Sequence, residues 1–188
     1  MLKIDGDKSH IEHFKPQYLC KQEDQQRIKK GERTMKEDID WNNLLACHPK
    51  STDAKTRPAA YGAFKKADFF DPDLLINPKQ EDPSNHLEFR IDGSVIHKTD
   101  KGQSTIEILG LNHPVLQKLR EASFIELGLS FKSKKPCSES AALRLADMAK
   151  HDGLEFAGAI PDAVNHYLTR LRRRKTRQQE QRTKRQSA

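Results

Sequence analysis

Two short segments of the chain carry side chains that could together hydrolyse a phosphodiester bond. The first, residues 9–16, contains His10, Glu12 and His13, and the second contains Asn43. A histidine can deprotonate water, a carboxylate can bind a metal ion that stabilises the departing oxygen, and an asparagine can hold the histidine in place. These residue types are the set that a one-metal nuclease requires.

The spacing within this first segment favours two metal ligands on one face of a β-strand. Side chains alternate along a strand, so His10 and Glu12 share a face, while His13 points the opposite way unless the backbone twists or bends. A histidine beside such a site can act as general base, and the amide of Asn43 is suited to orienting it. The other interpretation is a polar strand in which one histidine is hydrogen-bonded in the core.

The segment His10-Ile11-Glu12-His13-Phe14, followed by residues 40–47, resembles the HNH (ββα-metal) endonucleases. More narrowly, it resembles the PtuB-like nucleases of Septu-type and retron-associated anti-phage systems. The resemblance covers about residues 4–122.

It implies that His13 is the general base, that Glu12 binds the catalytic metal, and that Asn43 positions His13. His10 would be a further ligand. Lys65 matches a basic position and would touch a phosphate, with a solvated lysine as the alternative.

The same resemblance implies a cofactor and partners. The metal would be Mg²⁺ or Mn²⁺, the substrate DNA, and the role that of a defence effector working with an ATPase. A catalytically silent module that binds nucleic acid or a partner is the alternative function. A third hypothesis treats the His-Glu-His cluster as a structural zinc element without catalysis.

The sequence departs from these nucleases at the zinc knuckle that usually supports their site. Of its two cysteine pairs, only Cys47 is present as a remnant, and Tyr61 stands where the next cysteine would be. A single thiolate does not close a tetrahedral site, and Cys20 and His48 lack the expected spacing. Ala63 stands where a polar residue or histidine is common. We therefore expect either a nuclease that replaced its zinc with packing or an incomplete version, with a shortened start or as a decaying copy.

The composition indicates one ordinary domain, or a small domain with an extension. The chain has 188 residues, of which 35% are hydrophobic and 32% charged, and no apolar run approaches the roughly 20 residues that cross a bilayer. The N-terminus has no signal-peptide pattern. Three scattered cysteines do not make a disulfide framework, which predicts a cytoplasmic protein without membrane contact.

Positive charge is concentrated at the C-terminal end. Nine Lys or Arg and one Glu lie between residues 170 and 188, a net charge of +8 against +7 for the whole chain. Nucleic acid is the natural partner of such a segment, because cations that neutralise phosphates release counterions. The predicted nucleic-acid-binding side chains are Arg172, Arg173, Arg174 and Lys175. The alternative is a solvated tail without a specific ligand.

The predicted fold class is α+β, with an HNH-like core and a mainly helical C-terminal region. The predicted domains are residues 1–122, nuclease-like; 123–171, helical; and 172–188, a basic tail expected to be disordered. Strands are expected at 2–4 and 11–14, a hairpin over 86–97, and a further strand over 105–109. Residues 17–40 read as a long loop or an exposed helix, and a short helix is expected over 59–67. Helices are expected to begin near Pro114, Ser138 and Pro161, the second ending at Gly153.

Overall fold

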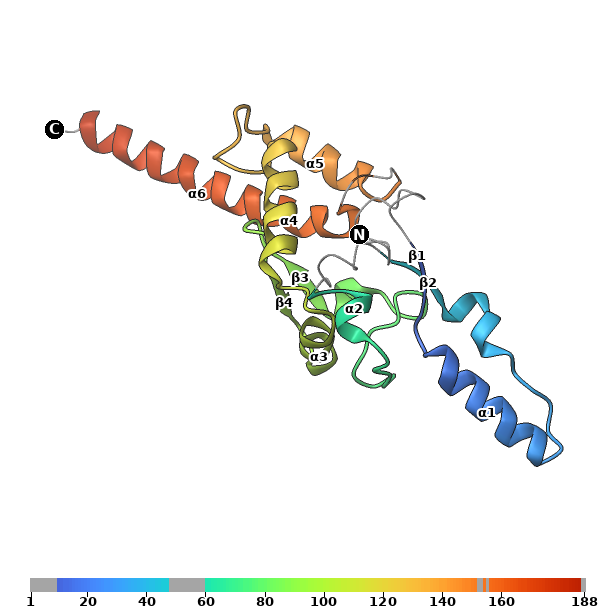
Figure 1. Cartoon of the computed structure of the whole chain (residues 1–188). Helices are drawn as coiled ribbons and strands as arrows, with labels where there is room; N and C mark the ends of the chain where they lie inside the picture. The colour runs from blue at the N-terminus through green and yellow to red at the C-terminus, as the bar shows by residue number, and fades with distance from the viewer. Residues whose placement is uncertain (1–9, 48–59, 152–153, 155, 187–188) are drawn as a thin grey trace. The chain divides into compact units, whose positions relative to one another are not determined.

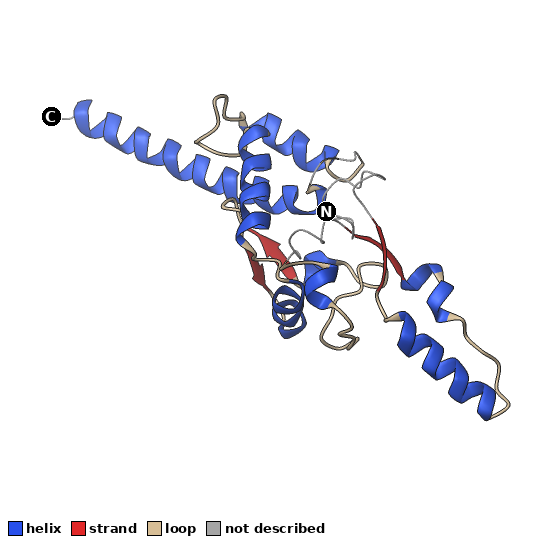
Figure 2. Cartoon of the chain, in the orientation of Figure 1, coloured by secondary structure: helices blue, strands red, loops and turns tan. Residues whose placement is uncertain are grey.

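The computed structural model describes residues 10–47, 60–151, 154 and 156–186 (Figure 1). Helices predominate within these ranges, and two small two-stranded sheets accompany them (Figure 2). The predicted α+β class is therefore confirmed. Within the same ranges, no helix is long and apolar enough to span a membrane.

The helices and strands alternate irregularly along the chain. The strands are β1 (His10–His13), β2 (Leu44–Cys47), β3 (Leu87–Phe89) and β4 (Val95–His97). The α-helices are α1 (Gln17–Lys29), α2 (Ala63–Lys66), α3 (Asp100–Leu109), α4 (Pro114–Glu126), α5 (Glu139–Met148) and α6 (Ile160–Gln186). Two 3₁₀ turns that matter for the site are η1 (Glu37–Ile39) and η2 (Trp41–Asn43).

The described residues divide into two compact units. The N-terminal unit contains residues 10–47, 60–87 and 97–113, and the C-terminal unit contains 88–96 and the described part of 114–186. The predicted boundary at residue 122 falls inside α4. In this division α4 belongs entirely to the C-terminal unit.

In the N-terminal unit, β1 and β2 pair antiparallel, and α1 with η1 and η2 fills the connection between them. The segment read as a long loop or exposed helix thus contains the 13-residue helix α1. Figure 1 shows α1 leading away from the two strands and the chain returning beside it. The short helix expected over 59–67 is present as α2.

The strand expected over 105–109 is wrong, because these residues form the second half of α3. The hydroxyl of Thr99 accepts a hydrogen bond from the Gly102 amide and caps the helix. Thr105 is buried, accepts a hydrogen bond from the Ile76 amide at 3.0 Å and donates one to the Leu74 carbonyl at 3.3 Å. The β-branched residues therefore serve helix packing, which overrides their strand propensity.

The C-terminal unit has its own hydrophobic core, in which α5 and α6 pack together. Its fully buried side chains include Phe124 of α4, Ala142 of α5, and Ile160, Val164 and Tyr167 of α6. The Tyr167 hydroxyl donates to the Cys137 carbonyl at 2.7 Å, so its one polar group is satisfied.

The hairpin predicted over 86–97 is confirmed as β3 and β4. Its turn is closed by a hydrogen bond from the Arg90 amide to the Ser94 carbonyl at 2.8 Å.

The three predicted helix starts are confirmed. Pro114 begins α4, the hydroxyl of Ser138 caps α5 by accepting from the Ala141 amide at 3.2 Å, and Pro161 lies in the first turn of α6. The strand expected at 2–4, His48 and Gly153 lie outside the described residues.

The basic tail differs from its prediction. Residues 172–186 were expected to be disordered, but α6 continues through them to Gln186. This stretch lacks Gly and Pro and consists largely of Arg, Lys, Gln and Glu, which have high helix propensity. The charge pattern that suggested disorder therefore coincides with a composition that sustains a helix.

Candidate functional site

The paired strands β1 and β2 present the acid–histidine cluster in the arrangement that strand alternation predicts. His10 lies opposite Cys47 and Glu12 opposite Leu45 in the antiparallel register, so all four residues share one face. The Nε2 atom of His10 lies 3.2 Å from Oε2 of Glu12, which confirms the shared face.

The imidazole of His10 packs against the short helix α2. The ring of Phe64 packs against it with centroids 6.0 Å apart and a tilt of 48°. The Nδ1 atom of His10 is buried, and no described residue offers it a hydrogen bond. A buried imidazole nitrogen without a partner is costly, because it has lost water without replacement. The Glu12–His10 face thus carries unsatisfied donor or acceptor capacity.

Glu12 and His10 fit a divalent metal ion as two ligands. Two adjacent ligands on an ion at about 2.1 Å lie about 3 Å apart, which matches the separation of Glu12 Oε2 and His10 Nε2. Mg²⁺ commonly takes one or two protein ligands and fills its other positions with water and substrate phosphate. In the part of the chain that the structure describes, no third His, Cys, Asp or Glu joins them. Ala63, at the start of α2, supplies no donor.

His13 is oriented by a backbone carbonyl of η1. Its Nε2 atom lies 2.8 Å from the carbonyl oxygen of Asp38. A carbonyl only accepts hydrogen bonds, so Nε2 carries the proton. In the neutral ring, Nδ1 is then the free base. The half-buried ring of His13 is therefore locked in the tautomer that has an accepting Nδ1.

Asn43 positions His13 through the main chain, not through the imidazole. Its Oδ1 accepts from the Lys15 amide at 2.7 Å, and its Nδ2 donates to the Lys15 carbonyl at 3.1 Å and to the Glu37 carbonyl at 3.0 Å. The Phe14 amide donates to the Asn43 carbonyl at 2.9 Å. The buried Asn43 amide thus fixes both the chain that follows His13 and the turn that carries Asp38.

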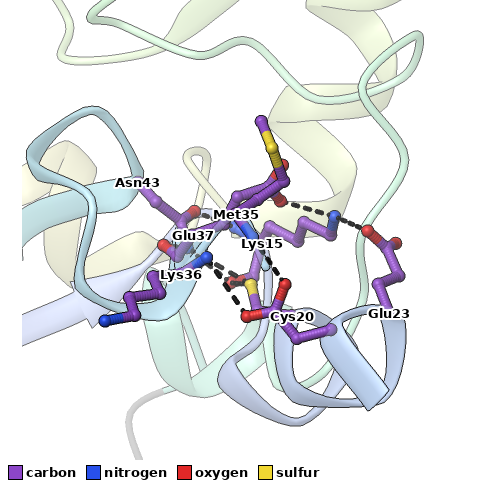
Figure 3. A network of polar contacts seen from close by, with 8 residues as sticks. Lys15, Cys20, Glu23, Met35, Lys36, Glu37 and Asn43 are labelled. Carbon is purple, nitrogen blue, oxygen red and sulfur yellow. Dashed lines mark hydrogen bonds and ion pairs between the residues drawn. The ribbon is translucent and has the colours of Figure 1, made fainter. Parts of the chain in front are cut away.

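Polar contacts around Lys15 tie α1 to the same turn (Figure 3). The Lys15 ammonium lies 2.6 Å from a carboxylate oxygen of Glu23 in α1 and 2.6 Å from one of Glu37 in η1. Burial lowers the pKa of Lys15, but the hydrogen bonds to Glu23 and Glu37 outweigh burial and raise it overall. Asp24 accepts from the Met35 and Lys36 amides.

Lys66 is a site residue that was not predicted from the sequence. Its side chain is buried, and its Nζ donates to the His13 carbonyl at 3.3 Å. Burial lowers the pKa of Lys66, and the charge of Glu12 acts in the opposite direction. The neighbouring Lys65 is exposed and donates to the Glu107 carbonyl of α3. No pattern in the sequence distinguishes the buried lysine of this pair from the exposed one.

Cys47 is a half-buried thiol beside the Glu12 face. Burial, reinforced by the negative charge of Glu12, raises the pKa of Cys47 to about 11. Tyr61, at the position of the expected second cysteine, packs on the His113 ring at 5.2 Å. One protonated thiol and a tyrosine do not fit a structural zinc ion, which is held by four nitrogen or sulfur ligands.

The predicted basic cluster of α6 is engaged with its own unit. Arg172 lies 2.6 Å and Lys175 3.7 Å from carboxylate oxygens of Glu139, and the Arg174 guanidinium lies 5.1 Å from the Phe131 ring centroid. These contacts position three of the four predicted nucleic-acid-binding side chains, although all four, including Arg173, remain exposed on the helix.

The comparisons with known proteins assign no relative to this arrangement. No protein-family model matches the chain, and no curated protein matches it significantly.

Proposed function

We propose that this protein is a metal-dependent HNH endonuclease that hydrolyses DNA phosphodiester bonds. In this proposal β1, β2 and α2 are the two strands and the helix of a ββα-metal core. The observation that carries the proposal is the hydrogen bond between His13 Nε2 and the Asp38 carbonyl, which leaves Nδ1 as a base. A general base needs this free lone pair within reach of the attacking water.

Each residue of the cluster has a separate task in the proposed reaction. His13 Nδ1 accepts a proton from the attacking water, and Asn43 fixes the backbone that follows His13 and the turn that carries Asp38. Glu12 and His10 would hold Mg²⁺ or Mn²⁺, whose positive charge would stabilise the leaving oxygen. Lys66 holds the His13 carbonyl from the side of α2.

The wider context is proposed on the same resemblance. The protein would be an anti-phage effector in the cytoplasm that works with an ATPase partner. Lys65 and the cluster Arg172, Arg173, Arg174 and Lys175 would bind DNA phosphates. Arg172 and Lys175 would have to exchange Glu139 for a phosphate, because both already contact that carboxylate.

A plasmid-nicking assay tests the proposal. Supercoiled DNA with Mg²⁺ or Mn²⁺ is expected to be nicked by the natural chain and left intact by His13→Ala, a loss of at least about 100-fold. His97→Ala removes an exposed histidine of β4 and serves as the matched control, which should retain full activity. A well-folded natural chain that leaves DNA uncut, alone and with its ATPase partner, would remove the enzymatic proposal.

A catalytically silent module that binds nucleic acid or a partner is the second candidate. Two observations favour it: Ala63 supplies no ligand, and the buried Lys66 ammonium already provides a positive charge for Glu12. Under this alternative the natural chain would bind DNA as tightly as His13→Ala does, and neither would cut it.

A further inference from the structure

The connection between β1 and β2 is an exposed arm, residues 17–41, with few buried side chains. Of the 13 residues in α1, only Cys20 is buried. Several large apolar side chains on the arm are exposed instead: Tyr18, Ile28, Met35, Ile39 and Trp41. The arm is held in place by the polar contacts of Lys15, Asp24 and Asn43 rather than by an apolar core. Its surface is therefore available for a ligand.

The acidic side chains of the arm are mostly paired, whereas most of its basic side chains are not. Its acidic side chains are largely engaged within the protein: Glu23 and Glu37 pair with Lys15, Glu32 lies 3.4 Å from Arg27, and Asp24 binds backbone amides. The remaining cations have no ion-pair partner among the described residues and are exposed: Lys21, Lys29, Lys30, Arg33 and Lys36. The outer half of the arm, residues 27–36, thus presents a cationic surface, with five Lys or Arg against Glu32.

Trp41 at the base of the arm is 76% exposed and is the only tryptophan of the chain. The Lys79 ammonium lies 4.0 Å from the centroid of its indole ring and also donates to the Trp41 carbonyl. One lysine therefore fixes both the backbone and the ring of an exposed aromatic side chain. Such a ring is prepared to stack on a planar ligand at little entropic cost.

We infer that the arm and Lys79 form a binding surface for single-stranded nucleic acid. The outer cations bind backbone phosphates, and the indole of Trp41 stacks on an unpaired base. Asp40 adjoins Trp41 in sequence and Asp38 lies three residues before it. Their carboxylates disfavour a phosphate there, which suits an uncharged base at this position. Trp41 precedes Asn43 by two residues, and Asn43 binds the main chain of Lys15, which follows His13 by two residues. This inference deepens the proposed nuclease function by naming its substrate class as unpaired nucleic acid.

Fluorescence of the single tryptophan tests the inference directly. The probe is a thymidine oligonucleotide of about 12 nucleotides, titrated into His13→Ala protein in EDTA so that no cleavage occurs. We expect saturable quenching of the Trp41 emission by the single strand and at least about 10-fold weaker binding of the matching duplex. Absence of quenching, or equal quenching by the duplex, would overturn the inference.

Anisotropy of a labelled oligonucleotide separates the two halves of the surface. Trp41→Leu is expected to weaken single-strand binding about 5- to 100-fold without changing its salt dependence. The triple variant Lys29→Glu, Lys30→Glu, Arg33→Glu is expected to weaken it at least 10-fold and to reduce the slope of log K against log salt by about 2.

The matched control variant reverses the charge of Arg182 and Arg185, two cations of α6 in the other unit. Circular dichroism verifies that every variant is folded. Unchanged binding in the arm variants, or a loss confined to the α6 variant, would contradict the inference. Because these measurements need no metal and no cleavage, they succeed or fail independently of the nicking assay.

Discussion

The side chain of Asn43 makes two hydrogen bonds to the main chain of Lys15: it accepts from the Lys15 amide and donates to the Lys15 carbonyl. These two hydrogen bonds join chain segments on either side of the arm. They close the arm at its base and set the direction in which the chain leaves His13. Residues far apart in sequence are thus brought into one rigid turn.

Replacing Asn43 is expected to destabilise this turn strongly. Asn43→Ala leaves the Lys15 amide without its acceptor and removes one of the hydrogen bonds that the Lys15 and Glu37 carbonyls each accept, so we expect a loss of about 2–3 kcal/mol in the free energy of unfolding. Urea denaturation measures this loss. Asn42→Ala, at the exposed neighbouring position, should stay within about 0.5 kcal/mol. Equal losses of stability in the two variants would contradict the stabilising role of the Asn43 hydrogen bonds.

The tautomer of His13 can be observed without any substitution. Because Nε2 donates to the Asp38 carbonyl, the neutral ring is expected to carry its proton on Nε2 and to leave Nδ1 unprotonated. Long-range ¹H–¹⁵N NMR correlation distinguishes the two nitrogens by their chemical shifts. A proton found on Nδ1 of the neutral ring would remove the basis for His13 as the proposed base.

Cys47 is expected to titrate near pH 11, because burial and the Glu12 charge raise its pKa. Its folded-state pKa lies above the ordinary value of 9.0, so its contribution to stability is complete below pH 9 and is lost as the pH rises towards 11. Alkylation by iodoacetamide should therefore be slow at pH 8 and accelerate towards pH 11. Cys47→Ala should lack the corresponding decline in stability. Rapid alkylation of Cys47 at pH 8 in folded protein would argue against this environment.

Replacing Gly102 even by alanine is expected to destabilise the protein, although this residue lies in a helix. A Cβ atom at this position would lie 2.2 Å from the backbone oxygen of His86. Gly102→Ala should therefore cost about 2–3 kcal/mol where helix propensity alone predicts a gain. Gly31→Ala is the control, since a Cβ there meets no atom within 4 Å and costs only about 1 kcal/mol for its φ of +74°. Thermal denaturation ranks the two, and a reversed order would contradict the close approach.

The parts of the fold that the sequence predicts are those with local signals. Ser138 caps α5, Pro114 and Pro161 lie in first turns, and Asp92 with Gly93 closes the hairpin, so each element is specified by residues within a few positions. The prediction failed at residues 105–109 because the apolar residues of a short segment fit a strand as well as a helix. The cap at Thr99 and the C-terminal Gly110 resolve this ambiguity in favour of α3.

The candidate site was predictable only in part. The shared face of His10 and Glu12 follows from strand alternation and needs no other segment. The contacts of Asn43 do not, because they depend on how the arm returns to β1. The burial of Lys66 likewise depends on the packing of a four-residue helix, too short for a periodic pattern. Long-range contacts set these features, and a single sequence carries no local signal for them.

The sparse burial of α1 has a consequence for local stability. Regions with few buried apolar contacts open at a lower free energy than the rest of a domain. Because Cys20 is the one buried residue of this helix, α1 is expected to exchange its amide hydrogens through local opening, while the main chain fixed by Asn43 exchanges more slowly. A ligand that orders the arm would bind against this opening equilibrium, and its affinity would include the free energy of closing α1.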